Sequence, residues 1–192
     1  MGRNEEALKE KKRAVELEPE EALYHDSLGD TLQEMGCNEE ALKERKRAVE
    51  LEPEDAFHHH GLGTVLQEMG CDKEALEEKK RAVELEPEKA LYHDSLGDML
   101  QEMGRNEEAL KEKKRAVELE PEEALYHYSL GTVLQEMGRN EEALKEKKKA
   151  VELEPEDALY HDSLGDTLQE MGRNEEALKE KKKAMELEEA GI

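Results

Sequence analysis

The chain has very few aromatic residues: no Trp, one Phe and five Tyr among 192 residues. Charged residues make up 42% of the sequence and hydrophobic residues only 35%. A globular protein of this composition has difficulty burying enough apolar surface to offset the entropy lost on folding. An ordered structure must therefore come from the pattern of the apolar residues rather than from their amount.

Long apolar runs and cysteines are also scarce. No apolar run approaches the ~18 residues that a membrane-spanning helix needs, and residues 1–12 contain no apolar signal-peptide core. Cys37 and Cys71 are one repeat apart, so we expect ~10 Å between them, beyond the ~7 Å between Cα atoms that a disulfide allows. The sequence predicts a cytoplasmic protein with no membrane segment and no disulfide.

Positive charge is in deficit, because 29 Lys and Arg face 52 Asp and Glu and leave a net charge of −23. Such an excess of negative charge repels nucleic-acid phosphates and anionic lipid surfaces. We therefore expect neither nucleic acid nor membrane as a partner. The charge favours a basic peptide or protein partner, or it serves only solubility, and the sequence leaves both interpretations open.

A 34-residue repeat occupies the whole chain. Prolines recur at 34-residue steps, at positions 19, 53, 87, 121 and 155. Methionines that precede glycine keep the same step, at positions 1, 35, 69, 103, 137 and 171. A repeat of this length is typical of helical solenoids. It predicts a single solenoid domain over residues 1–192, with units that start at these six methionines.

Each unit contains two predicted helices. The first covers about residues 22–35, where apolar residues follow helical spacing, and Gly36 ends it in a left-handed conformation. We expect Asn38 to cap the second helix, which ends before Pro53 because proline lacks an amide hydrogen. The chain starts and finishes with a helix of the second type. The pattern therefore predicts eleven helices, five of the first type and six of the second.

Each unit resembles the tetratricopeptide repeat, and the resemblance covers essentially the whole chain. The family pattern is W-x2-L-G-x2-Y, then A-x3-F, then P. The corresponding residues in one copy are His25, Leu28, Gly29, Leu32, Ala41, Arg45 and Pro53. The resemblance implies an all-α fold, a right-handed superhelical solenoid of antiparallel helix pairs. Both a natural array and a consensus-like engineered repeat protein fit this pattern.

All three aromatic places of the family pattern are changed in this chain. His25 stands for Trp, Leu32 for Tyr and Arg45 for Phe, and the last place is Lys in the other units. A charged residue on an apolar stripe must extend its head to water or pair with an opposite charge. We expect Tyr24, one place before His25, to supply part of the missing aromatic bulk.

In tetratricopeptide proteins the first helices of the units line a concave groove that binds extended peptides or partner helices. The resemblance implies that the same positions form a groove here for a protein or peptide partner. These positions are Leu23, Asp26, Asp30, Gln33, Phe57, His60, Thr64, Gln67, Leu91, Asp94, Asp98, Gln101, Leu125, Tyr128, Thr132, Gln135, Leu159, Asp162 and Asp166. Aspartates spaced i, i+4 form an acidic stripe on one helix face. The stripe favours a basic ligand, and a solvated face without a ligand is the alternative.

The two ends of the predicted solenoid carry apolar residues without a polar capping helix, although solenoids usually need capped ends. We expect these residues to mediate self-association into a homodimer or a head-to-tail oligomer. They are Leu8, Val15, Leu178, Met185 and Leu187. A truncated longer array would explain the missing caps equally well.

No motif in the sequence indicates catalysis. The chain has no glycine-rich phosphate loop and no Gly-x-Ser-x-Gly elbow. Five of its seven histidines occupy one place of the repeat, as a structural residue does. The consecutive residues His58, His59 and His60 point about 100° apart on a helix, so they cannot share one ion well. We therefore expect no catalytic residue, no metal, no cofactor and no enzymatic activity.

Overall fold

A computed structural model describes the backbone of residues 2–191 and, within them, the side chains from residue 5 onward. This part of the chain contains eleven helices and no strand, as predicted. The helices are α1 (Gly2–Leu17), α2 (Ala22–Glu34), α3 (Asn38–Leu51), α4 (Ala56–Glu68), α5 (Asp72–Leu85), α6 (Ala90–Glu102), α7 (Asn106–Leu119), α8 (Ala124–Glu136), α9 (Asn140–Leu153), α10 (Ala158–Glu170) and α11 (Asn174–Ala190). We call the even-numbered helices first-type and the odd-numbered helices second-type.

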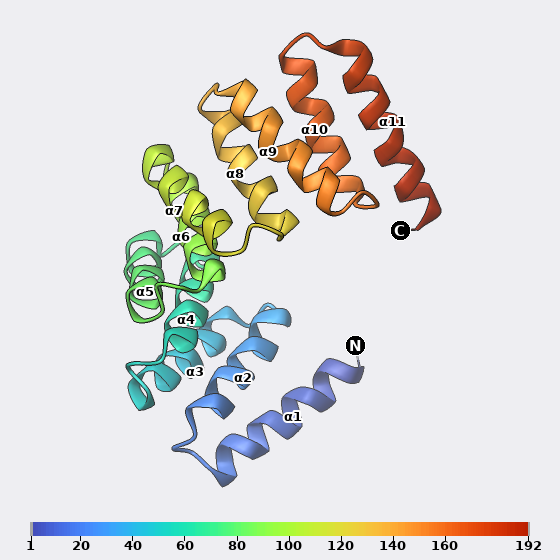
Figure 1. Ribbon diagram of the computed structural model, residues 1–192. Helices are drawn as coiled ribbons and strands as arrows, with labels where there is room; N and C mark the ends of the chain where they lie inside the picture. Colours follow the sequence, from blue (N-terminus) through green and yellow to red (C-terminus); the bar gives the residue numbers. More distant parts are fainter. Residues whose placement is uncertain (1, 192) are drawn as a thin grey trace. The chain divides into compact units, whose positions relative to one another are not determined.

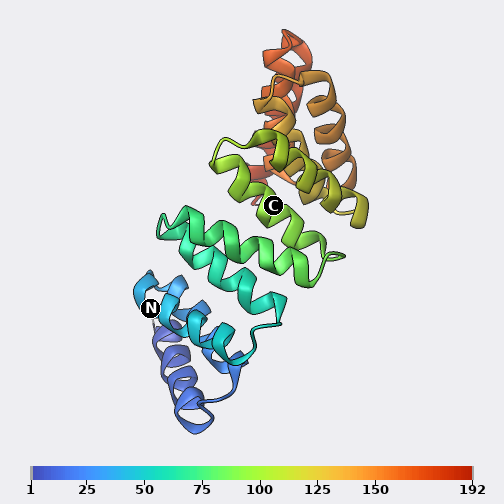
Figure 2. The same ribbon diagram turned by 90° about the vertical axis from the view of Figure 1, so that its left-hand side faces the viewer.

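The chain divides into two compact units, Met1–Glu88 and Lys89–Ile192. The first contains α1–α5 and the second contains α6–α11. Within each unit, consecutive helices pack against each other as antiparallel neighbours (Figure 1), and the second view shows the same pairing (Figure 2). Two pairs of first-type helices also contact each other, α2 with α4 in the first unit and α6 with α8 in the second.

Glycine ends the first-type helices in the predicted way. Gly36 follows α2 with φ +73°, and its amide donates to the Gln33 carbonyl at 2.9 Å. The amide of Cys37 reaches back to the Leu32 carbonyl at 2.8 Å. These two bonds satisfy carbonyls that the last turn leaves without partners, and a positive φ is favourable for glycine alone. The chain can therefore reverse within three residues and begin α3.

The expected cap of the second-type helices is wrong. Cys37, not Asn38, is the N-cap of α3, and neither it nor its counterpart Arg105 caps the helix through its side chain. Asn38 is already the first helical residue, and its Oδ1 is buried without a hydrogen-bond partner among the described residues. Glu39 and Glu40 in the first turn complement the positive end of the helix dipole instead. Both cysteines of the chain are free.

The core is built from alanines, leucines and tyrosines. Tyr126 packs against Ala90 and Ala116 in the second unit, and Tyr160 makes the same contacts one repeat later. Both tyrosines are equivalents of Tyr24, so the prediction that this position supplies aromatic bulk is confirmed for these two copies. A buried alanine on each neighbouring helix leaves the space that the tyrosine ring fills.

Candidate functional site

The charged residue at the family's Phe position is buried in the internal second-type helices. Arg45, Lys79, Lys113 and Lys147 are each no more than 4% exposed. The glycine of the Leu-Gly pair makes room, because a Cβ atom on Gly97 would lie 2.9 Å from Lys113 Cγ and Cε. The sequence did not decide whether this charged side chain extends to water or is paired inside the protein. The structure shows that it is buried in these four helices.

Two aspartates of the preceding first-type helix hold this cation in alternate repeats. The clusters are Arg45 with Asp26 and Asp30, Lys113 with Asp94 and Asp98, and Lys181 with Asp162 and Asp166. In the first cluster Arg45 Nη1 donates to Asp26 Oδ1 at 2.8 Å. In the third, Lys181 Nζ lies 3.1 Å and 2.5 Å from its two aspartates. Each pair of predicted groove aspartates therefore already has a cationic partner inside the protein.

Burial decides which of these aspartates a ligand could reach. Asp26 and Asp94 are 1% and 6% exposed. The exposed ones are Asp30, Asp98, Asp162 and Asp166. Burial raises the pKa of Asp94, although the Lys113 ammonium acts in the opposite direction. Asp26 and Asp94 lie inside the packed helices, so they cannot belong to a face that touches a ligand.

The cation of the intervening repeat has a different environment. Lys147 Nζ donates to Gln135 Oε1 and lies 3.4 Å from the Ser163 carbonyl oxygen. Burial lowers the pKa of Lys147 to about 8, and the carboxylates of Asp166 and Glu170 offset only part of this effect. Arg45, Lys113 and Lys181 are thus each held by two carboxylates, whereas Lys147 is a buried lysine held by neutral oxygens.

A histidine–glutamate contact, which we did not predict, ties each first-type helix to its second-type partner. His25 Nδ1 lies 2.6 Å from Glu44 Oε2, and His25 Nε2 lies 3.0 Å from the Pro19 carbonyl oxygen. The equivalent pairs are His59 with Glu78, His93 with Glu112, His127 with Glu146 and His161 with Glu180. The histidine that replaces the family's Trp is therefore a buried structural residue, as its repetition indicated. The constant 19-residue separation from a glutamate was the available sequence signal.

Exposed apolar side chains mark the start of every first-type helix. They occupy the second helical position and are between 42% and 55% exposed: Leu23, Phe57, Leu91, Leu125 and Leu159. Large apolar side chains at equivalent positions in consecutive repeats form a pattern that solubility alone does not explain. All five belong to the groove set that the resemblance implied.

Glutamine–glutamate hydrogen bonds lie at the other end of the same helices. Gln33 Nε2 donates to Glu68 Oε1 at 2.5 Å between α2 and α4. In the second unit the bonds from Gln101 to Glu136 and from Gln135 to Glu170 are both 2.7 Å long. The glutamates are exposed, whereas Gln33, Gln101 and Gln135 are half-buried. Gln67, the remaining predicted glutamine, is also half-buried.

Apart from the exposed Phe57 and Leu125, the predicted groove positions of α4 and α8 are half-buried. Thr64 Oγ1 donates to the His60 carbonyl at 3.0 Å, and Thr132 makes the same bond to Tyr128. Burial, together with the charges of Lys79 and Arg45, lowers the pKa of His60 to about 4. The Tyr128 ring lies against Tyr160, with 5.4 Å between the ring centroids.

The residues expected at the ends of the solenoid differ in exposure. Leu178 and Met185 on α11 are 71% and 61% exposed. Leu187 is buried, and Leu8 and Val15 on α1 are half-buried. Only the first two thus present a large apolar surface.

Comparison with known proteins agrees with the repeat and the helix pairs. The model of a protein family described as tetratricopeptide repeat matches residues 50–190. The chain belongs to the tetratricopeptide repeat family. Proteins of this family generally act in protein–protein interactions, binding peptides or proteins, and are typically non-enzymatic scaffolds. The predicted tetratricopeptide solenoid is therefore confirmed.

Solved structures with the same fold cover nearly the whole chain. A crystal structure of MamA is 26% identical over 85% of this chain and 96% of that one, with a TM-score of 0.75. A MamA structure from Desulfovibrio magneticus RS-1 is 25% identical and covers 88% of this chain and 96% of that one, with a TM-score of 0.77. YrrB, described as a TPR protein with an unusual peptide-binding site, is 26% identical over 92% of this chain and 91% of that one, with a TM-score of 0.69. No curated protein sequence matches the chain.

Within residues 2–191, no helix has both the length and the apolar character that a membrane span requires.

Proposed function

We propose that this tetratricopeptide repeat protein is an interaction scaffold that binds a polypeptide with apolar and basic side chains. In each of the two units, the binding face consists of the exposed apolar residue and the terminal glutamate of each first-type helix. These residues are Leu23, Phe57, Leu91, Leu125 and Leu159, together with Glu34, Glu68, Glu102, Glu136 and Glu170. The exposed apolar residues at one repeated position carry the proposal.

The two parts of the binding face lie on the same side of each helix. Leu23 and Glu34 are eleven residues apart, which is three helical turns or about 16 Å. The apolar residue would contact an apolar side chain of the ligand, and the carboxylate would contact a basic one. The same arrangement recurs on each first-type helix of both units.

The aspartate pairs contribute less to this face than the sequence indicated. Each pair is already bound to an internal cation, as in the cluster of Arg45 with Asp26 and Asp30. The acidic residues that a ligand can reach are therefore the glutamates at the ends of the helices and the four exposed aspartates, Asp30, Asp98, Asp162 and Asp166. We propose that the leucines supply affinity and the glutamates select basic partners.

Fluorescence anisotropy with three labelled peptides of equal length tests the proposal. One peptide alternates Leu and Lys, one alternates Leu and Glu, and one alternates Ser and Lys. We expect saturable binding of the Leu–Lys peptide, and binding weaker by about tenfold or more for each of the others. Equal binding of the Ser–Lys peptide would show that negative charge alone attracts the ligand, and would contradict the apolar anchors.

A matched pair of variants assigns the binding to the face. In the second unit, Leu91→Ser, Leu125→Ser and Leu159→Ser together remove three apolar anchors. Leu17→Ser is the control, because Leu17 is 71% exposed but lies on the second-type helix α1. We expect loss of Leu–Lys binding in the triple variant and no change in the control. Unchanged binding in both variants would overturn the proposed face.

Self-association is the second candidate function, and the exposure of Leu178 and Met185 on α11 favours it. Their counterparts one repeat earlier, Leu144 and Val151, pack into a cluster with the leucines of α10. Light scattering over a hundredfold range of concentration tests this candidate. A mass that grows in the unmodified chain but not in a Leu178→Ser, Met185→Ser variant would support it.

The cytoplasmic location expected from the sequence stays a prediction.

A further inference from the structure

His58 is an exception within the repeat. The equivalent position holds tyrosine in the other four first-type helices, at Tyr24, Tyr92, Tyr126 and Tyr160. His58 is 3% exposed, so this imidazole ring is enclosed by the surrounding helices. A buried histidine in place of a tyrosine brings a metal-ligating nitrogen to a site where the other repeats have none.

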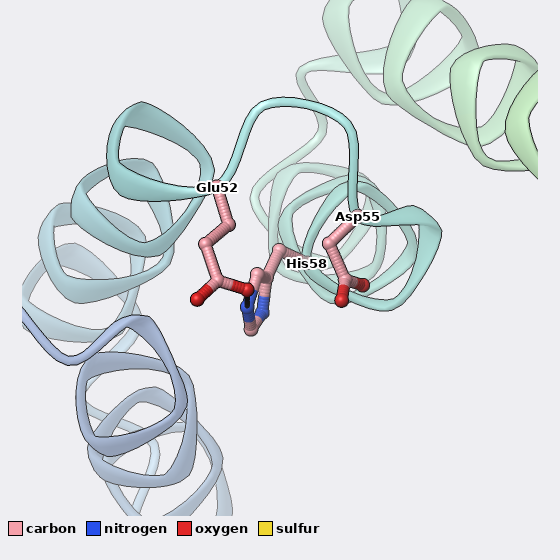
Figure 3. Close-up of side chains that lie close together, drawn as sticks. All are labelled: Glu52, Asp55 and His58. Atoms are coloured by element: carbon pink, nitrogen blue, oxygen red, sulfur yellow. Dashed lines mark ion pairs between the residues drawn. The ribbon is translucent and has the colours of Figure 1, made fainter.

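Two carboxylates face the outer edge of this ring. Glu52 follows the last residue of α3 and Asp55 precedes the first residue of α4 (Figure 3). One ligand atom from each of Glu52, Asp55 and His58 lies within 4.8 Å of the others. His58 Nε2 and Glu52 Oε2 are 3.6 Å apart. Two ligands of a tetrahedral ion with bonds of about 2.1 Å are separated by about 3.4 Å, so a small adjustment would bring both onto one ion.

The inner edge of the ring faces a third carboxylate. His58 Nδ1 lies 3.4 Å from Asp26 Oδ1, and Asp26 is itself held by Arg45 at 2.8 Å. Metal-binding histidines usually direct their second ring nitrogen to a carboxylate, which fixes the ring orientation and strengthens the ligand. The packing of α2, α3 and α4 thus already provides the outer-shell partner that such a site requires.

The ligands are held in place by the backbone around them. Asp55 Oδ1 accepts a hydrogen bond of 2.8 Å from the Phe57 amide, which fixes this carboxylate at the start of α4. The neighbouring histidine does not compete, because His59 Nδ1 contacts Glu78 and His59 Nε2 contacts the Pro53 carbonyl. Of these two adjacent histidines, only His58 directs a nitrogen to the carboxylate pair.

We propose that Glu52, Asp55 and His58 form a binding site for one divalent transition-metal ion, with Zn²⁺ as the best-fitting ion. One imidazole nitrogen and two carboxylate oxygens are ordinary zinc ligands, and water would complete the coordination. The metal would join the end of α3 to the start of α4. It would therefore stabilise the folded first unit, since the unfolded chain does not hold these three groups together.

Isothermal titration with ZnCl₂ tests the site, in a Cys37→Ser, Cys71→Ser background that removes competing thiols. The titration is run at pH 8, because metal ligands must be deprotonated and protons compete less with the metal at this pH. We expect one zinc ion per chain and an increase in the melting temperature. A second titration with MgCl₂ should show no comparable binding, because Mg²⁺ prefers oxygen ligands in octahedral geometry.

Two substitutions that copy other repeats provide the decisive comparison. His58→Tyr restores the residue of the other four repeats, so the fold should be retained while zinc affinity falls by about tenfold or more. His60→Tyr copies Tyr128, two repeats later, and should leave zinc binding unchanged. Equal zinc affinity in His58→Tyr and the unmodified background would overturn the proposal. Absence of saturable binding up to millimolar zinc would also overturn it, and would mean that His58 only pairs with Asp26 and Glu52.

Discussion

Arg45 Nη1 lies 2.8 Å from Asp26 Oδ1, and both side chains are almost completely buried where α2, α3 and α4 meet. The same contact recurs between Lys181 and Asp162 at 3.1 Å, but there the aspartate side chain is 53% exposed. One interaction therefore occurs in this protein in a dry and in a solvated environment. Because Asp26 is buried, it contributes to the packing of the repeat and not to the surface of the protein.

The first prediction compares these two environments. Arg45→Met leaves Asp26 buried without its cation, so it should destabilise the protein by about 3 kcal/mol. Lys181→Met breaks the solvated contact and should cost less than about 1 kcal/mol. Urea unfolding followed by circular dichroism measures both. Equal costs for the two substitutions would show that burial of the Arg45 cluster does not matter for stability.

The helix boundaries were largely predictable, because glycine and proline act locally. Gly36 requires only its own left-handed conformation, and Pro53 only its missing amide, so the sequence shows both ends of the helix pair. The cap at Asn38 failed because capping depends on where the backbone enters the helix, and that point lies one residue earlier. A residue whose side chain can cap a helix does not always form the cap.

The candidate site was less predictable, because its chemistry depends on tertiary contacts. The spacing of Asp26 and Asp30 correctly indicates one helix face, but it does not show that Arg45 from the next helix occupies that face. The exposed position of Leu23 followed from the family resemblance, whereas the burial of Asp26 required the packing of α4 against α2 and α3. Helical spacing identifies a face but not what covers it.

The second prediction concerns the histidine–glutamate contact. His127→Phe removes both the 2.7 Å contact to Glu146 and the 3.0 Å contact to the Pro121 carbonyl. It should cost about 2 kcal/mol, the usual contribution of a hydrogen bond to a charged group. Glu146→Gln keeps an oxygen acceptor and should cost less. Urea midpoints that are the same for both variants would contradict a specific role for the carboxylate.

The third prediction is that the stability of the protein depends on pH because of Lys147. Burial lowers its pKa from 10.5 to about 8, so between these values the folded state has released a proton that the unfolded state still binds. Stability should therefore rise with pH in this window, by up to about 2–3 kcal/mol. Burial also raises the pKa of Tyr126 and Tyr160 to about 12, so tyrosine ionisation lowers stability only above their ordinary value of 10.

Urea midpoints at pH 7.5 and pH 10 measure this effect. Lys147→Met should remove the rise, and the exposed neighbour Lys148→Met should retain it. A rise that persists in Lys147→Met would show that another group causes it.

The proposed binding face is tested most directly by comparing two variants in one anisotropy titration with the Leu–Lys peptide. The first combines Leu91→Ser, Leu125→Ser and Leu159→Ser; the second combines Asp98→Asn, Asp162→Asn and Asp166→Asn, the exposed aspartates of the same unit. We predict that the leucine variant weakens binding by about tenfold or more and that the aspartate variant changes it by less than about threefold. The reverse order would contradict this account, because it would make the aspartates the ligand-binding residues.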